Sequence, residues 1–228
     1  ERKTPSNILT TIRGGCLLCF RQKTWETKPV CHAFLTDSRF YQFLFRIDQS
    51  IAEEVQAAGC QCGGVLHSAC YPRKPRGHRL ALDESYAYRL SFCCATEGCR
   101  RRTTPPSVRF LGRKVYLGVL VVLISALQGG VSPGRRRQLV DTLEVPAQTL
   151  WRWQQWWREV FAEGPWWRLE HAQFIPPIAA ARLPGELLTR LGGAHLSERL
   201  VRMLWLIAPV TTTSWAGSLT VRTDPQNL

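Results

Sequence analysis

Cysteine pairs in the middle of the chain have the types and spacing of metal ligands. Cys60 and Cys62 stand on one side of a stretch of about thirty residues, and Cys94 and Cys99 stand on the other. Four thiolates satisfy the tetrahedral coordination of Zn²⁺, with Zn–S bonds of about 2.3 Å. The glycine that follows the second cysteine in CQCGG lets backbone amides turn toward the sulfur atoms. The pattern predicts a zinc centre held by these four cysteines.

The spacing of these cysteines departs from the usual zinc-ribbon pairs in two places. The first pair is C-x-C, and the second is C-x4-C with Cys94 or C-x5-C with Cys93. We favour Cys94 because the shorter spacing closes a tighter turn, although strand alternation leaves the choice open. His67 and Cys70 are substitute ligands if Cys60 does not bind. The alternative interpretation is a set of buried free cysteines, a residue type often found inside proteins.

A third group of cysteines lies near the start of the chain, in CLLC at 16–19 and in Cys31-His32. Its spacing is also ligand-like, but no ribbon pattern surrounds it, so a poorly structured leader over 1–32 is the alternative. The total of nine cysteines is odd, and the first residues lack the pattern of a signal peptide. We therefore expect a cytoplasmic, nucleoid-associated bacterial protein whose cysteines bind metal rather than form disulfides.

Positive charge is concentrated on and beside the module that contains Cys60, Cys62, Cys94 and Cys99. The chain has 30 Lys+Arg against 17 Asp+Glu, a net charge of +13, which favours a polyanionic partner. Between Tyr71 and Lys114, eleven cations, with Arg79, Arg89 and Arg109 among them, face only three acidic residues. A solvated cationic surface is the alternative to phosphate binding. We expect phosphate contacts from Arg73, Lys74, Arg76, Arg100, Arg101, Arg102, Arg113 and Lys114.

The stretch RRRQLVDTLEVPAQTLWRWQQWW at 135–157 has the pattern of a helix-turn-helix. Apolar residues within 139–143 would form the inner face of the first helix, and Val145 would follow the turn. Pro146 sits where a first-turn proline is tolerated, whereas Glu144 stands where glycine is common. An ordinary helical hairpin is the alternative. The second helix and its continuation would bury a row of apolar side chains: Leu150, Trp153, Trp157, Val160 and Phe161.

This arrangement leaves the start of the second helix facing outward, where side chains of such motifs reach base edges. Glutamine can read adenine and arginine can read guanine in the major groove. An exposed tryptophan can stack on sugar or base. The sequence therefore predicts duplex DNA as a partner, contacted here by Gln148, Thr149, Trp151 and Arg152.

An amphipathic helix is predicted over 33–59, ahead of the first cysteine pair. Apolar residues recur there at spacings of three and four, with Phe43 among them. Asp37 or Ser38 could cap the start of the helix, and Gly59 would end it.

The remaining elements complete a mostly helical α+β fold. Short alternating runs such as YAYRLSFC predict a zinc-ribbon-like basic module over 60–114. The apolar run VYLGVLVVLISAL is shorter than the roughly 20 residues of a bilayer span, so it predicts a buried helix within a helix-turn-helix domain at 115–164. Helical pieces between Pro/Gly breaks predict a C-terminal extension at 165–228. The module is thus inserted between an N-terminal helix and a helical domain.

The segments CGGxLHxAxYPRKPRG, RLSFCC and GCRRRTTPPSVRFLGRKVYLG, with the helix-turn-helix after them, resemble proteins of bacterial mobile elements. These are the zinc-ribbon and helix-turn-helix proteins of the transposase-like or transposon-accessory class. The resemblance covers about residues 33–162, and VPAQTLWRW is also similar to the second half of the motif in many bacterial regulators and transposases. It implies sequence-directed binding to element DNA, with the four paired cysteines as the positions that bind Zn²⁺.

No convincing catalytic constellation accompanies these motifs. Two-metal transposition chemistry needs three carboxylates on one sheet, whereas the acidic residues here are few and scattered. Tyr71 and Tyr116 lie near basic residues but in no recognisable active-site motif. Besides a DNA-binding accessory protein, two interpretations stay open. One is the front end of a transposase or recombinase whose catalytic part is on a partner chain, and the other is a zinc-stabilised RNA-binding or protein-interaction module.

Overall fold

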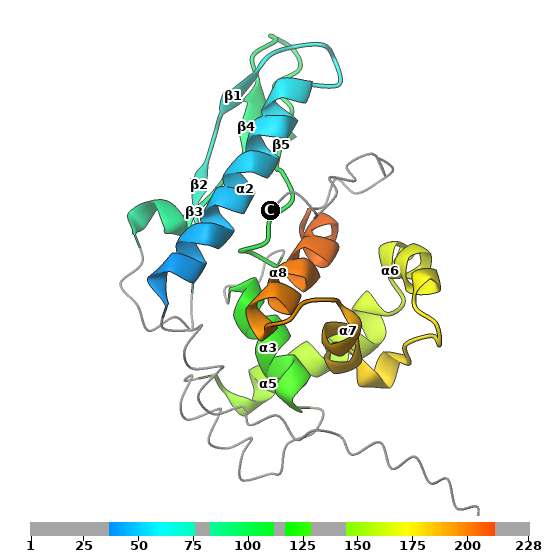
Figure 1. Cartoon of the computed structure of the whole chain (residues 1–228). Coiled ribbons are helices and arrows are strands. Elements are labelled where there is room, and N and C mark those ends of the chain that lie inside the picture. The colour runs from blue at the N-terminus through cyan, green and yellow to red at the C-terminus, as the bar shows by residue number, and fades with distance from the viewer. Residues whose placement is uncertain (1–36, 76–82, 112–116, 129–144, 213–228) are drawn as a thin grey trace, which may run out of the picture.

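Helices make up most of the regular structure of the described chain, and small sheets gather at one end. The computed structural model describes residues 37–75, 83–111, 117–128 and 145–212. In Figure 1 the strands lie beside α2 in the upper part, and the other helices form the lower part. This arrangement confirms the mixed, mostly helical α+β class predicted from the sequence.

The first described helix, α2 (Ser38–Ala58), has the caps that the sequence predicts. The Asp37 carboxylate accepts a hydrogen bond from the Arg39 amide at 2.9 Å, and Gly59 ends the helix with φ of 72°. Phe43, one of the apolar residues that recur at helical spacing, has a side chain that is 37% exposed. The buried face is instead formed by Phe40, Tyr41, Leu44, Ile47, Asp48, Ile51 and Ala52.

In the described residues after α2, five short strands form two antiparallel sheets. The larger sheet has the order β1 (Leu66–Ser68), β4 (Phe92–Cys94), β5 (Arg102–Thr103). The smaller sheet pairs β2 (Tyr71–Pro72) with β3 (Tyr88–Arg89). The run YAYRLSFC, predicted as one strand, is divided between the end of a 3-10 turn, β3 and β4.

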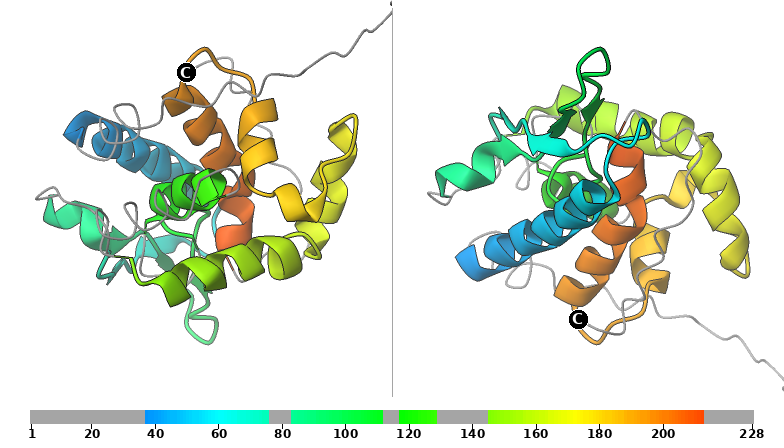
Figure 2. Two further views of the ribbon diagram at one scale, coloured as in Figure 1. Left: turned by 90° about the horizontal axis from the view of Figure 1, so that it is seen from below. Right: turned by 90° about the horizontal axis from the view of Figure 1, so that it is seen from above.

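Helix α3 (Gly118–Gln128) lies at the centre of the helical part, as Figure 2 shows from two directions. Its residues from Val119 to Ile124 are all buried, because a helix that is apolar all round needs cover on every side. The segment set apart in the sequence analysis as a C-terminal extension supplies part of this cover, with α7 (Gly185–Arg190) and α8 (Leu196–Ile207) both packed against α3. One core therefore extends from α2 to α8.

Aromatic residues pack α5 (Ala147–Gln155) and its continuation against this core. Leu150 and Trp153 are buried on one face of α5, as predicted. The chain then forms a π-helix at Trp156–Phe161, in which the Ala162 amide donates to the Trp157 carbonyl at 3.3 Å. Because π-type bonding changes the spacing of inward positions, Phe161 stays buried while Val160 is 61% exposed. The prediction of Val160 as an inward residue is wrong.

Next along the chain is α6 (Pro165–Glu170), whose Trp166 and Trp167 are buried.

Candidate metal centre and nucleic-acid interface

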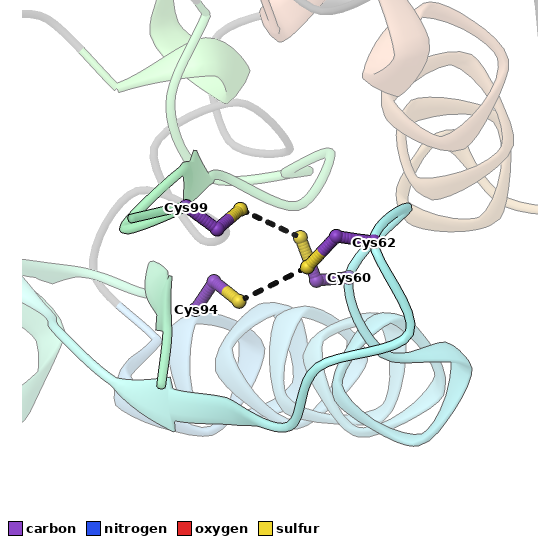
Figure 3. Close-up of side chains that lie close together, drawn as sticks. All are labelled: Cys60, Cys62, Cys94 and Cys99. Carbon is purple, nitrogen blue, oxygen red and sulfur yellow. Dashed lines mark hydrogen bonds between the residues drawn. The ribbon is translucent and has the colours of Figure 1, made fainter. Parts of the chain in front are cut away.

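Four cysteine sulfur atoms converge beside the larger sheet, from two turns that are far apart in the sequence (Figure 3). The Sγ atoms of Cys60 and Cys99 are 3.8 Å apart, and those of Cys62 and Cys94 are 3.5 Å apart. All four Sγ atoms lie within 4.8 Å of one another. These are the cysteines that the sequence analysis paired, and the single residue between Cys60 and Cys62 does not keep their sulfur atoms apart.

The first turn of the cluster is closed by two backbone hydrogen bonds around CQCGG. The Gly63 amide donates to the Cys60 carbonyl at 2.8 Å, and the Cys60 amide donates to the Gly64 carbonyl at 2.9 Å. Gly63 has φ of 82°, a conformation that residues with a Cβ atom adopt at a cost. The tight turn explains how both cysteines of a C-x-C pair reach one centre.

The second turn brings Cys94 and Cys99 together over four intervening residues. The Cys99 amide donates to the Thr96 carbonyl at 3.1 Å, and Gly98 takes the positive φ, 82°, that the turn requires. The following residue, Arg100, also has a positive φ, of 44°, which is uncommon for a residue with a side chain. The turn therefore ends by directing the chain abruptly from Cys99 into the basic strand β5.

Strand register determines which of the two adjacent cysteines joins the cluster. Phe92 and Cys94 are buried on the face of β4 that packs toward α2, whereas Cys93 points to the other face. The Cys93 thiol donates to the Arg100 carbonyl at 3.4 Å instead. The substitute ligands considered from the sequence, His67 and Cys70, are exposed and lie outside the cluster, as Cys93 does.

The donor set and its dimensions fit a tetrahedral metal ion. For Zn–S bonds of about 2.3 Å, tetrahedral geometry places the sulfur atoms about 3.8 Å apart. The Sγ–Sγ distances in the Cys62–Cys94 and Cys60–Cys99 pairs, 3.5 and 3.8 Å, are close to that value. An all-thiolate set is typical of structural zinc sites and of iron–sulfur proteins, and it leaves no open position for catalysis.

The cluster shifts the pKa values of its own thiols in opposite directions. The Gly64 amide, and then the neighbouring thiols, lower the pKa of the Cys62 thiol to about 6 by stabilising its thiolate. At Cys99 the Arg101 amide lowers the pKa, but the other cysteines and partial burial outweigh it and raise the pKa to about 11. Ionising one thiol of the cluster therefore makes it harder to ionise the next, because neighbouring thiolates repel one another. A divalent cation bound between them would reduce this repulsion.

Gly64 leaves the space that the sulfur atoms occupy, a role the sequence analysis did not identify. A Cβ atom at this position would lie 2.1 Å from Thr96 Oγ1 and 2.8 Å from Cys94 Sγ. The Thr96 hydroxyl itself lies 3.9 Å from Cys62 Sγ. The two adjacent glycines in CQCGG were the sequence feature that could have indicated this role. Gly63 adopts the positive φ of the turn, and Gly64 lets the Cys94 sulfur and the Thr96 hydroxyl lie close to the backbone.

The apolar core beneath the cluster is small. Two of the four cluster cysteines contribute to it, and its buried members are Ala52, Cys60, Leu66, Phe92 and Cys94. A module with so few large apolar side chains gains little from hydrophobic burial, so cross-linking by a metal ion would supply much of its stability.

Among the cations predicted to bind phosphate, those that the structure describes are exposed or half-buried. Lys74, Arg100, Arg101 and Arg102 are exposed and Arg73 is half-buried, whereas Arg76, Arg113 and Lys114 lie outside the described residues, as Arg79 does.

Arg89 and Arg109, which contributed to the count of basic residues, are buried and cannot face a ligand. The Arg109 guanidinium pairs with Asp48, and Arg89 donates to the Pro105 carbonyl at 2.5 Å. Both were counted with the basic flank but not among the residues expected to bind phosphate, and internal acceptors hold their guanidinium groups inside the protein.

The outward face of α5 carries the residues predicted to contact bases. Gln148 and Arg152 are exposed, Thr149 is half-buried, and Trp151 is 57% exposed, an unusual degree for so large an apolar side chain. The helix that would precede α5 in a helix-turn-helix, at 135–144, lies outside the described residues. The structure therefore describes α5, the second helix of the predicted helix-turn-helix, but not the first helix or the turn.

Comparison with protein-family models, with curated proteins and with solved structures finds no match to this chain. Separately, none of the helices described combines the length and hydrophobicity needed to cross a bilayer.

Proposed function

We propose that this chain is a zinc-stabilised, sequence-directed DNA-binding protein. The observation that carries the proposal is the continuity between the cysteine cluster and a basic strand: Cys99 is followed directly by Arg100, Arg101 and Arg102, all exposed. A Zn²⁺ ion bound by the four thiolates would fix the start of this strand. It would thereby hold three guanidinium groups close together, and each of them can donate two parallel hydrogen bonds to a phosphate group.

The outward face of α5 supports a second, base-reading contact. Gln148, Trp151 and Arg152 follow one another at helical spacing, and the opposite face of the helix is buried in the core. A helix anchored in this way presents amide, aromatic and guanidinium groups that suit adenine, sugar and guanine respectively. Phosphate contacts from the module would set the register, and α5 would supply the sequence preference.

The class of protein is proposed from the sequence motifs. Their resemblance to zinc-ribbon and helix-turn-helix proteins of mobile elements favours an accessory DNA-binding protein that acts with a recombinase or transposase encoded nearby. The cluster geometry agrees with a structural role for the metal, because four thiolates leave no site for a reacting water.

Selection from a random duplex pool tests this function. The zinc-loaded chain of 228 residues should enrich a short motif, and its affinity for that motif should exceed its affinity for arbitrary duplex by at least about 10³-fold. Competition with RNA and with single-stranded DNA is the control. Equal affinity for all three nucleic acids, with no enriched motif, would contradict sequence-directed binding and favour the RNA or general polyanion alternative.

A further inference from the structure

The larger sheet has two faces of opposite character. Across β1 and β4, Leu66 pairs with Cys94, and both are buried toward α2. The alternate row runs across all three strands, since His67 pairs with Cys93 and Cys93 pairs with Arg102. Side chains of directly paired residues lie on the same face, so these three share the face turned away from α2. We call it the outer sheet face; His67 and Arg102 are exposed on it.

Arg102 is held in place on this face before any ligand arrives. Its guanidinium carbon lies 5.6 Å from the centre of the Tyr71 ring, and its Nη1 donates to the Ala69 carbonyl at 3.3 Å. Stacking on an aromatic ring and one hydrogen bond restrict the rotamers of the side chain. The guanidinium has five N–H donors, so most of them stay available to an anion. A restrained, exposed arginine loses less entropy on binding than a free one.

Charge divides between the two sides of the module. Helix α2 covers the inner face, where Gln56 Nε2 donates to the Leu66 carbonyl at 3.1 Å. Its half nearer the cysteine cluster exposes Glu53 and Glu54, whereas its exposed arginines, Arg39 and Arg46, lie in the first half of the helix. From 47 to 72 the sequence has no lysine or arginine. The outer sheet face and the turn after Cys99 instead carry the exposed arginines. Such a division of charge would orient the module on a polyanion, with α2 directed away.

We propose that the outer sheet face, through Arg102, Tyr71 and His67, is the surface on which the module rests against the sugar-phosphate backbone of duplex DNA. The inference rests on the proposed function and adds an orientation to it: the sheet faces the DNA and α2 faces solvent. It also gives His67 a role at the interface rather than at the metal. The cysteine cluster then lies at one end of the bound face, where it fixes the turn that leads into β5.

Two matched pairs of variants test this orientation by charge. Arg102→Ala removes a cation from the outer sheet face, and Arg46→Ala removes one from the exposed side of α2. His67→Glu adds a carboxylate to the outer sheet face, and Gln49→Glu adds one to α2. Binding of each zinc-loaded chain to a labelled duplex of arbitrary sequence is measured by fluorescence anisotropy at several salt concentrations. Bound zinc per chain confirms that each variant retains its fold.

Arg102→Ala should raise Kd about two- to fivefold and lower the slope of log Kd against log salt by about 0.9. Arg102→Lys should keep the slope, because it keeps the charge. Arg46→Ala and Gln49→Glu should leave both quantities unchanged, whereas His67→Glu should weaken binding.

Equal effects of the α2 and sheet variants would overturn the orientation while leaving DNA binding intact. The same titrations with a labelled single strand test the choice of duplex. If Arg102→Ala weakened binding to the single strand but not to the duplex, that choice would be overturned. Failure of the wild-type chain to bind any duplex would overturn the proposed function, and this inference with it.

Discussion

Asp48 and Arg109 form a buried ion pair that joins the middle of α2 to the segment leaving the larger sheet. Arg109 Nε lies 2.7 Å from Asp48 Oδ2, and both side chains are almost completely buried. Asp48 also accepts from the Ser107 hydroxyl at 2.6 Å and from the Val108 amide at 2.7 Å. Arg109 in turn donates to the Tyr86 carbonyl at 2.8 Å. This network satisfies the two charges and ties three distant segments together.

Removing one charge of this pair should strongly destabilise the fold. Asp48→Asn keeps the shape of the side chain but leaves the buried guanidinium without a counter-charge. We expect a loss of about 3 to 5 kcal/mol in the free energy of unfolding, measured by urea denaturation. Asp37→Asn is the matched control, because it removes an exposed partner of Arg39 and asparagine caps helices well. A loss at Asp48 no larger than that at Asp37 would show that the network contributes little.

Metal binding should depend on Cys94 and not on its neighbour Cys93. Cys94→Ser removes a cluster thiol, so the purified chain should carry one zinc ion fewer and the module should unfold at a lower temperature. Cys93→Ser changes a thiol on the opposite face of β4 and should leave the zinc content unchanged. Elemental analysis and thermal denaturation measure the two effects. Loss of metal from the Cys93 variant with retention in the Cys94 variant would reverse the assignment. A chelator should lower the denaturation temperature of the wild-type chain in the same way.

Crowding at Gly64 and strain at Gly63 should have different consequences. Gly64→Ala puts a methyl group against Cys94 Sγ and Thr96 Oγ1, so we expect zinc affinity to fall about 10- to 100-fold, as for changes next to ligands. Gly63→Ala meets no atom within 4 Å and strains only the backbone, at a cost of about 1 to 2 kcal/mol in stability. Competition with a chromogenic chelator separates the two. Equal zinc affinity in both variants would exclude the steric role of Gly64.

The cysteine cluster and the limits of α2 could be predicted because local chemistry determines them. Thiols at ligand spacing have few other uses, and Asp37 and Gly59 act on the residues next to them. The choice between Cys93 and Cys94 could not be made from alternation, because β4 has only three residues and its pairing partners are distant in sequence. Which face of a short strand turns inward is decided by the helix that covers it.

The burial of the charged residues Asp48 and Arg109 could not be predicted from the sequence. Asp48 lies between Ile47 and Gln49 on an amphipathic helix, and its residue type does not distinguish it from the exposed Glu53 and Glu54. Arg109 likewise lies in a basic stretch and counts as one more surface cation until its partner is known. Asp48 and Arg109 are 61 positions apart, so their pairing depends on the tertiary structure. Val160 was misplaced for a related reason, since a π-helix changes the period on which the prediction relied.

Alkaline pH should destabilise the fold through Tyr41, whose burial raises its pKa to about 12 from a usual 10.0. The folded state holds the phenolic proton more tightly than the unfolded state, so this contribution to stability is complete below pH 10. It is lost as the pH rises from 10 to 12, by about 2 to 3 kcal/mol. Tyr41→Phe keeps the edge-on contacts with Phe40 and Tyr86 but has no proton to lose. The variant should therefore lose less stability over this pH range, and identical pH profiles by urea denaturation would contradict the prediction.

Arg152 and Arg101 should contribute to DNA binding in different ways. Arg152 is exposed on α5 beside Trp151, where a guanidinium can read guanine, so Arg152→Ala should cost about 1 to 3 kcal/mol on the selected sequence and little on arbitrary duplex. Arg101, whose guanidinium is oriented by a hydrogen bond to the Gln61 side chain, stands next to the metal turn. Arg101→Ala should weaken binding to all duplexes alike and reduce the salt slope by about 0.9. Titrations of both variants with selected and scrambled duplexes make the comparison. If Arg152→Ala lowered both affinities equally, α5 would contact the backbone, and sequence preference would have to come from another part of the chain.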